Sequence, residues 1–472
     1  MNKNSLIWLR RDLRLYDNAA LFHALKNSNQ VYVVFIFDTH ILNKLKNKQD
    51  RRIEFIHGSL SEIKEGLNRQ DSDLIVEKGE PESLIPKLIT KYKCDSLYIN
   101  RDYEKYAQDR DNLIIKLLAK NQINTYTFKD QVLFEKAEIL TQSNKPYTVF
   151  TPYKNNHLKK LAEEGIHLYD CDMYKSNFAK FSYKSIPTLE ELQFEKTNLE
   201  DFNIPSGTSG GKKLLEKFNN NIKYYSSNRN YPFIRGVSYL SVHNRFGTLS
   251  IRHLAKMAIE SDNAGSATWL SELIWRDFYF QIVANFPHVS DNKSFKPQFE
   301  NLQFENDTNK FEAWKNGLTG FPIIDAAMKQ INQTGYMHNR LRMIVSSFLV
   351  KDLLIDWRWG EQYFQDNLID FDFSANNGGW QWAASTGCDS QPYFRIFNPT
   401  LQSEKFDKDG SFIKKYLPQL EPLSSKQIHA PWVHFEKNPD IFPIKLGRDY
   451  PLPIVNHTEQ RDKALNMYKA CK

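Results

Sequence analysis

Short apolar runs alternate with longer amphipathic stretches through the first 130 residues of the chain. Most of these runs lack a polar residue at every second position, which is typical of strands buried on both faces of a sheet. The predicted strands are Ser5–Leu9, Val31–Phe37, Leu74–Val76, Ser96–Asn100 and Asn124–Phe128. The stretches between them predict helices at Asp17–Lys26, Arg51–Asn68, Pro81–Lys91 and Asp102–Lys120. Strands that alternate with helices build a doubly wound parallel sheet, so we expect an N-terminal α/β domain.

The loop after the first predicted strand argues against a dinucleotide-binding domain of the Rossmann type. That loop contains no G-x-G-x-x-G sequence. A ligand of this domain is therefore expected at the carboxyl ends of the strands, where open parallel sheets bind their ligands.

The alternation stops after Lys129. Pro146, Pro152 and Pro187, together with many Asn, Ser and Lys residues, predict a long linker on the surface. Beyond the glycine-rich segment 207–211 the hydrophobic period is helical. The helices predicted there are Lys212–Tyr225, Ser250–Ile259, Ala267–Asn285, Phe311–Gly317, Pro322–Thr334, Asn339–Leu353 and Trp359–Leu368. We predict an α/β domain at 1–130, an interdomain linker at 131–203 and a helical domain at 204–472.

The composition limits the classes of protein to which the chain can belong. Its 472 residues are enough for two domains, each with its own core. The four scattered cysteines offer neither paired metal spacing nor a disulfide framework, and no early apolar run suits a signal peptide. We expect a protein of the reducing cytoplasm, with no metal and no membrane anchor. The net charge of +7 is a weak indication of a polyanionic partner.

The first stretch that could carry chemistry is Trp269–Tyr279. At helical spacing Glu272, Trp275, Arg276 and Tyr279 fall on one face of a helix. An acid, an indole, a guanidinium and a phenol together suit a polar pocket better than an apolar core. The alternative is an ordinary amphipathic helix with an Arg–Glu pair one turn apart.

A second such face is predicted in Gly335–Met343, where Asn339 and Met343 are one turn apart and Arg340 and Arg342 flank them. Helix starts favour acids over arginines, so a negatively charged partner near these arginines is attractive. The alternative is a helix with Asn339 as its cap and basic residues directed to solvent.

The third stretch, 369–387, holds two acids, three amides, three glycines and two indoles, a poor composition for an ordinary helix. Gly378 and Gly379 would let backbone approach a flat ligand. Asn376 and Asn377 can offer the donors and acceptors that a flavin edge requires. The alternative is a tight loop that packs two tryptophans.

A fourth stretch, 236–241, carries hydroxyls and turn amides that could hold phosphate without a lysine. Serine-rich turns are common, so this indication is weak by itself.

Together these stretches resemble the photolyase/cryptochrome family, and specifically the bacterial class I cyclobutane-dimer photolyases. The segments that carry the resemblance are LIWLRRDLRLYDNAA at 6–20, TGYMHNRLRM at 334–343, FLVKDLLIDW at 348–357, NNGGWQWAASTG at 376–387 and PYFRIFNP at 392–399. The resemblance covers almost the whole chain. It implies an antenna-binding α/β domain, a long linker and a helical domain that encloses FAD.

The resemblance also implies a function. Excited, reduced FAD would pass an electron to a cyclobutane pyrimidine dimer flipped out of double-stranded, UV-damaged DNA, and the dimer would split. Photolyases as a class flip the damaged bases out of the duplex before they act on them. We expect a monomeric deoxyribodipyrimidine-splitting lyase, cytoplasmic and associated with the nucleoid through DNA. We do not expect it to bind a membrane.

The resemblance assigns residues to three sites. The FAD phosphates would lie near Tyr225, Val237, Ser238, Tyr239, Leu240 and Ser241. The isoalloxazine would lie near Trp269, Asn339, Arg342, Asp370, Phe371, Asp372 and Asn376. DNA and the flipped dimer would contact Arg229, Glu272, Trp275, Arg276, Asn339, Arg340, Met343, Trp382 and Gln402.

Two of these residues receive catalytic roles. Asn376 would face flavin N5, where a neutral amide tolerates the anionic reduced flavin better than a carboxylate would. Glu272, when protonated, would hydrogen-bond the pyrimidine carbonyls and steady the radical anion.

The chain departs from the family pattern in its tryptophan relay, which reduces FAD in related proteins. Trp380 and Trp357 match the first two members, but Phe304 stands at the third position. We hypothesise a rerouted chain Trp380–Trp357–Trp359.

Two further departures concern ligands. Val237 and Tyr239 replace a more typical Thr and Arg in the phosphate stretch. Tyr106 and Ala107 replace an Asn–Glu pair that contacts the antenna in folate-binding relatives. The antenna is thus open between methenyltetrahydrofolate, a deazaflavin, another flavin and none.

Other functions within the family are less consistent with the residues. A (6-4) photolyase would carry histidines at the positions of Asn339 and Met343. A DASH-type protein would differ at Met343 and Trp382. A cryptochrome photoreceptor, the alternative function, often has another residue than Asn376 near N5 and a C-terminal extension.

Overall fold

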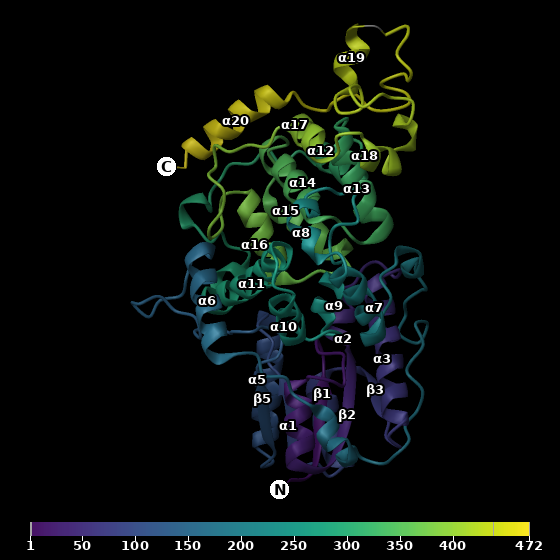
Figure 1. Cartoon of the computed structure of the whole chain (residues 1–472), viewed down its shortest axis with the longest axis vertical. Helices are drawn as coiled ribbons and strands as arrows, with labels where there is room; N and C mark the ends of the chain where they lie inside the picture. Colours follow the sequence, from purple (N-terminus) through teal and green to yellow (C-terminus); the bar gives the residue numbers. More distant parts are fainter. Residues whose placement is uncertain (1, 438, 472) are drawn as a thin grey trace. The chain divides into compact units, whose positions relative to one another are not determined.

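The computed structural model of the chain describes residues 2–437 and 439–471 (Figure 1). It divides into two compact units. Unit 1 comprises residues 1–223 and 238–287, and unit 2 comprises residues 224–237 and 288–472, without the undescribed positions. The predicted boundaries at 130 and 203 follow changes in the hydrophobic pattern rather than the limits of these units, and they stay predictions.

A five-stranded sheet lies in unit 1, and every neighbouring pair of strands in it is parallel. The strands are β1 (Asn2–Leu9), β2 (Ser28–Asp38), β3 (Leu74–Gly79), β4 (Ser96–Asn100) and β5 (Asn124–Phe128), in the order β3-β2-β1-β4-β5. The strand order reverses between β1 and β4, which is the switch point where such sheets bind ligands. The predicted doubly wound α/β fold is confirmed.

Helices pack against this sheet (Figure 1). They are α1 (Ala19–Asn27), α2 (Thr39–Leu42), α3 (Arg51–Asn68), α4 (Pro81–Lys91) and α5 (Lys105–Ala119). Asn18 caps α1 by accepting from the backbone N–H of Leu21, and Asp50 caps α3 in the same manner. Apolar residues of strands and helices, such as Trp8, Val34 and Leu97, form their common core.

The predicted linker contains a helix, α6 (Phe150–Glu164), that the sequence pattern did not indicate. Pro152 is the third residue of α6, within the first turn, where a missing backbone N–H breaks no helical hydrogen bond. Pro152 is therefore compatible with a helix at this position. The rest of unit 1 contributes η1 (Cys171–Asn177), η2 (Leu199–Phe202), α7 (Gly207–Asn219), η3 (Ile222–Tyr224), α9 (Ser241–Phe246), α10 (Ile251–Ser261) and α11 (Ala264–Asn285).

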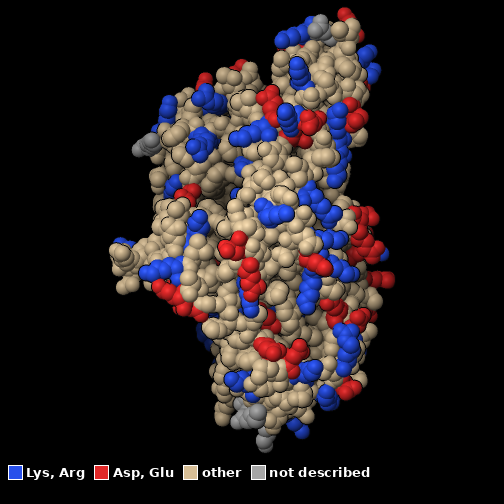
Figure 2. All heavy atoms as spheres, in the orientation of Figure 1, with Lys and Arg blue, Asp and Glu red and all other residues tan. Residues whose placement is uncertain are grey.

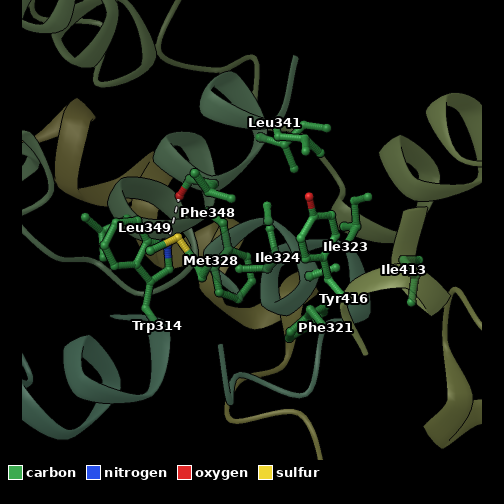
Figure 3. Packing of buried hydrophobic residues seen from close by; sticks show 14 of the residues in the cluster. Trp314, Phe321, Ile323, Ile324, Met328, Leu341, Phe348, Leu349, Ile413 and Tyr416 are labelled. Atoms are coloured by element: carbon green, nitrogen blue, oxygen red, sulfur yellow. Dashed lines mark hydrogen bonds between the residues drawn. The ribbon is translucent and has the colours of Figure 1, made fainter. Parts of the chain in front are cut away.

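Unit 2 is helical. Its elements are α8 (Tyr225–Asn228), η4 (Pro287–Asp291), η5 (Pro297–Phe299), α12 (Thr308–Asn316), α13 (Pro322–Thr334), α14 (Asn339–Lys351), α15 (Trp357–Asn367), α16 (Phe373–Ala383), α17 (Pro399–Phe406), α18 (Ser411–Tyr416), η6 (Pro418–Leu420), α19 (Pro431–Lys437) and α20 (His457–Lys469). Figure 3 shows its core, where Met328 and Leu349 pack beside Trp314. No helix in the described part of the chain has the length and apolarity needed to cross a bilayer.

A buried ion-pair network in unit 1 connects α10 with residues 14–17 and 130. Asp130 accepts from the Arg14 and Arg252 guanidiniums, each at 2.7 Å, and Arg252 also pairs with Asp17 at 3.0 Å. Burial raises the pKa of Asp130, but the two guanidiniums outweigh this effect and hold its pKa below the ordinary value. The network ties a helix from the predicted helical domain to the α/β domain.

His243 gives the stability of the protein a pH dependence. Its ring is buried, its Nδ1 lies 2.7 Å from Thr248 Oγ1, and burial lowers its pKa from 6.5 to about 4. The unfolded chain therefore binds more protons between these values, and stability is lost as the pH falls through 6.5. We expect His243 to cost about 2 kcal/mol at pH 5.

Urea denaturation at pH 7 and pH 5 measures this contribution. His243→Gln should lose about 2 kcal/mol less than the unaltered protein on acidification, because glutamine does not titrate. His167→Gln, at a position that is not buried, is the control. An equal loss in all three proteins would contradict the prediction.

Candidate functional site

The predicted polar face of α11 exists in unit 1. Glu272, Trp275, Arg276 and Tyr279 are all partly exposed, whereas Trp269, one turn before Glu272, is buried against Phe218 with ring centroids 5.0 Å apart. The asparagine at 263 caps this helix through a reciprocal capping box with Ser266. The helix therefore presents an acid and an indole side by side at a fixed spacing.

Trp275 is held by a residue that the sequence pattern did not indicate. Phe150 of α6 stacks on it with ring centroids 3.6 Å apart and planes 9° apart. A stacked ring fixes the indole plane, and the Tyr279 ring also contacts the indole, with centroids 5.5 Å apart. Phe150 lies in the segment interpreted as linker, so no sequence signal pointed to it.

Arg276 has a structural role within unit 1. Its Nη1 donates to the Gln131 carbonyl, and its guanidinium lies 4.5 Å from the Phe280 ring centroid. Its contact with DNA stays a prediction.

Asn339 opens α14 in unit 2 but does not cap it. The cap is His338, whose Nδ1 accepts from the Arg340 backbone N–H at 3.2 Å. Burial, with smaller contributions from Arg340 and Arg342, lowers the pKa of His338 to about 4, which keeps its ring neutral and able to accept. The alternative role of Asn339 as a helix cap is therefore wrong, and its exposed amide remains available for a ligand.

Arg342 forms a firm ion pair with Asp370. Its Nη2 lies 2.9 and 2.8 Å from the two carboxylate oxygens, and its Nε donates to the Met337 carbonyl at 2.8 Å. The Asp370 side chain is almost completely buried. The pair joins the first turn of α14 to the segment before α16, and it fixes both predicted isoalloxazine neighbours.

Residues 373–383 form the helix α16, so the alternative of a tight loop is wrong. Asp372 caps the helix by accepting from the backbone N–H groups of Ser374 and Ala375. The cap and the packing of the indoles compensate for the low helix propensity of Gly378 and Gly379. Phe371 packs against the core of unit 2.

The amides of α16 are held by Glu361 of α15. The Asn376 Nδ2 donates to the Glu361 carbonyl at 3.1 Å, and the Asn377 Nδ2 donates to the Glu361 carboxylate at 2.9 Å. Burial raises the pKa of Glu361 to about 7. Because its Nδ2 is engaged, Asn376 has its Oδ1 left to accept from a ligand. Glu361 was not predicted as a site residue, because in the sequence it is only a single acid in an amphipathic helix.

Two buried polar atoms on α16 test whether this region suits a flavin. Ser374 Oγ and Trp380 Nε1 have no hydrogen-bond partner among the described residues. Buried polar groups are ordinarily satisfied, and the carbonyls and ring nitrogens of an isoalloxazine could satisfy these. The donor set of α14 and α16 therefore fits FAD.

Trp380 packs against Gly360 of α15. A Cβ added at Gly360 would lie 2.0 Å from Trp380 Cη2, so Gly360→Ala must displace the indole. We expect a loss of about 1–3 kcal/mol in the free energy of unfolding, as in other overpacked cores. Gly379→Ala is the control, because its Cβ would meet no atom within 4 Å. Urea denaturation of both variants checks the difference, and equal stabilities would contradict it.

The remaining predicted DNA contacts of unit 2 are Arg229, Arg340, Met343, Trp382 and Gln402, and the last of these belongs to α17. Arg340 donates to Asn230 Oδ1 at 2.7 Å and lies 4.5 Å from the Phe406 ring centroid. Arg229 lies 5.7 Å from the ring centroid of Tyr225. Met343, Trp382 and Gln402 are partly exposed, as are both arginines. Figure 2 shows Lys and Arg side chains interspersed with Asp and Glu over most of the face in view.

The predicted phosphate stretch forms a tight turn. Tyr239 has φ of +57°, which few non-glycine residues adopt, and the Leu240 N–H lies 3.4 Å from Ser238 Oγ. Ser241 begins the short helix α9. Residues 238–241, Trp269, Glu272, Trp275 and Arg276 belong to unit 1, and the other residues predicted to contact FAD or DNA belong to unit 2. A shared pocket stays a prediction.

A polar cluster occupies the switch point of the sheet. Arg10 donates to the Asn100 carbonyl, and Asn100 Nδ2 donates to Asp12 at 2.6 Å. The Arg10 and Arg110 guanidiniums each lie 4.7 Å from the Trp8 ring centroid. These side chains fill the carboxyl ends of β1 and β4 with internal contacts.

Tyr106, one of the antenna positions, is also engaged internally. Its hydroxyl donates to Asp38 Oδ2 at 2.7 Å, and Ala107 beside it is buried. These contacts do not identify an antenna, so its chemistry stays open.

Three side chains near this end of the sheet could hold a cation by distance. The ligand atoms of His40, Glu80 and Glu82 lie within 4.8 Å of one another. His40 Nε2 already lies 2.7 Å from Glu82 Oε1, and this hydrogen bond explains the arrangement without an ion.

Two family models match the chain. Residues 269–470 match the FAD binding domain of DNA photolyase, and residues 5–169 match DNA photolyase. Among curated proteins, the chain is 36% identical to the deoxyribodipyrimidine photo-lyase of Escherichia coli (strain K12), over 99% of this chain and 98% of that one. It is 37% identical to the protein of the same name from Vibrio cholerae, over 99% of both chains.

Solved structures agree with these matches. A bacterial class III photolyase from Agrobacterium tumefaciens has a TM-score of 0.89 and 32% identity, over 100% of this chain and 98% of that one. A cryptochrome from Synechocystis sp. PCC6803 has a TM-score of 0.88 and 27% identity, over 98% of this chain and 99% of that one.

Proposed function

Because the chain belongs to the photolyase/cryptochrome family and carries its FAD-binding domain, we propose that it splits cyclobutane pyrimidine dimers in DNA under light. Full-length similarity to proteins named deoxyribodipyrimidine photo-lyase carries this proposal. The protein would act in the cytoplasm, on double-stranded DNA at the nucleoid.

The residues of α11 and α16 support the proposal through their chemistry. Trp275 and Trp382 offer flat apolar surfaces on which the flipped bases can stack. Glu272, when protonated, can donate to a pyrimidine carbonyl. When bound and reduced, FAD supplies the electron that opens the dimer and receives it back.

Asn376 would set the electrostatics beside the cofactor. Its amide carries no charge, and its Nδ2 is occupied by the Glu361 carbonyl. The Oδ1 would therefore accept from flavin N5–H without repelling an anion. Arg342, paired with Asp370, would hold the same ring from α14.

Light-dependent loss of the lesion tests this function. The purified protein is reduced, mixed with an oligonucleotide that contains a thymine dimer, and illuminated with blue light or kept dark. We expect dimers to disappear only in the light. Glu272→Ala should lower the repair per absorbed photon, whereas Glu260→Ala, at an exposed acid of α10, should not.

The same experiment separates repair from signalling, the second candidate function. The structural similarity to a cryptochrome is the observation that favours signalling. A flavin that changes its redox state in the light while the dimers stay intact would overturn the repair proposal.

A further inference from the structure

Trp314 is a buried indole of α12 that no part of the proposed repair site uses. Its ring lies 6.2 Å from that of Trp380, centroid to centroid, with an angle of 69° between the planes. Trp314 is fully buried, and its Nε1 donates to the Val345 carbonyl at 3.2 Å. Figure 3 shows this indole beside Leu349 and Met328 in the unit 2 core. In the described part of the chain, the rings in contact with Trp380 are those of Trp314 and Phe364.

A second set of contacts leads from Trp314 to a partly exposed indole. The Phe311 ring lies 5.9 Å from that of Trp314 and 5.2 Å from that of Trp359. Trp359 is partly exposed, whereas Trp314 and Trp380 are buried. The three indoles therefore form a route from the buried face of α16 toward solvent, with Phe311 as a bridge.

We propose that Trp314 is the relay between Trp380 and Trp359 when the oxidised flavin is reduced by light. This inference rests on the proposed position of the flavin beside Trp380. One electron passes from Trp380 to the excited flavin, Trp314 then reduces Trp380, and Trp359 reduces Trp314. The oxidised Trp359 loses its indole proton to water, and an external thiol restores it by giving up one electron and one proton.

This route revises the hypothesis that Trp357 is the middle member. Trp357 has no ring contact with Trp380 among the described residues, although both indoles belong to the same core. The Arg358 guanidinium lies 4.7 Å from the Trp357 ring centroid, and a cation there opposes positive charge on the indole. Pairing of Arg358 with Asp356 and Glu300 moderates this effect.

Tyr363 also contacts Trp314, with ring centroids 5.6 Å apart, but it is a poor terminal donor. Oxidation of a tyrosine releases its phenolic proton, which needs a base. The Tyr363 hydroxyl donates to Asn332 Oδ1 at 2.6 Å, and an amide oxygen is not a base. Burial raises the pKa of Tyr363 to about 12, so the phenol carries its proton before oxidation and would have to release it without a base.

Transient absorption of the full-length protein with oxidised FAD tests the relay, with the tryptophanyl radical as the readout. Trp314→Phe and Trp359→Phe should lose the long-lived radical, because the positive charge then returns from Trp380 to the flavin. Phe311→Leu should slow its formation. Tyr363→Phe and Trp432→Phe are the matched controls and should keep it. The melting temperature and flavin content of each variant show whether it is folded.

The outcomes separate the relay from the position of the flavin. A Trp314→Phe protein that is folded, binds FAD and keeps the long-lived radical overturns the relay. Loss of the radical in Trp357→Phe but not in Trp314→Phe also overturns it. An unchanged signal in Trp380→Phe overturns the relay and the proposed flavin position together. A Trp380→Phe protein without the signal supports that position whatever the Trp314 variant does.

Discussion

Asp370→Ala should release the flavin and destabilise unit 2. Asp370 is buried and accepts two hydrogen bonds from Arg342, so its removal leaves a guanidinium without its counter-charge. Breaking a buried ion pair from one side costs about 3–5 kcal/mol. The Arg342 side chain keeps 26% exposure, which places the expected loss near the lower end, at about 3 kcal/mol.

Urea denaturation and the ratio of flavin to protein absorbance measure the two effects. Asp370→Asn should retain most of the stability, because an amide oxygen still accepts from Arg342. Asp449→Ala, which removes a more exposed pair with Arg448, is the matched control and should change neither quantity. A stable, fully yellow Asp370→Ala protein would show that the pair is dispensable.

Replacing Trp275 and Trp382 together by alanine should weaken binding to a thymine-dimer duplex by about 2–6 kcal/mol. Each indole contributes about 1–3 kcal/mol by stacking on one base. The two effects should add if the tryptophans touch different bases. Titration of a labelled duplex at fixed salt measures the loss.

Undamaged DNA is the internal control for this double variant. Non-specific affinity comes from basic residues and phosphates, so it should stay unchanged. Phe150→Leu should weaken dimer binding less than Trp275→Ala does, because it removes only the ring stacked behind Trp275. Equal loss on damaged and undamaged DNA would show that the tryptophans do not recognise the dimer.

The sheet could be predicted from the sequence because its signals are local. Leu74, Ser96 and Asn124 begin strands where the apolar runs begin, and Pro81 begins α4. Strand ends were less accurate, since β2 extends beyond its apolar run on both sides. There the neighbouring strands continue the hydrogen-bond ladder, which single residues do not reveal.

Contacts between residues distant in the sequence determine the secondary structure of the segments that the pattern did not predict. The composition of 373–383 disfavours a helix, but Asp372 caps it and Trp380 fits against Gly360. The family resemblance identified candidate site residues, but it could not identify the residues that contact them and hold them in place. Phe150, Glu361 and Trp314 act through neighbours that are distant in the sequence.

The order in which the chain passes between the two units affects its folding during synthesis. The backbone crosses between the two compact units at residues 223–224, 237–238 and 287–288. Unit 1 is thus incomplete on the ribosome until residue 287 has emerged, because α11 contacts α6. A nascent chain that stops before α11 leaves apolar surface of α6 uncovered, and such surface favours aggregation. We therefore expect truncated chains that end before α11 to aggregate more readily than chains that include it.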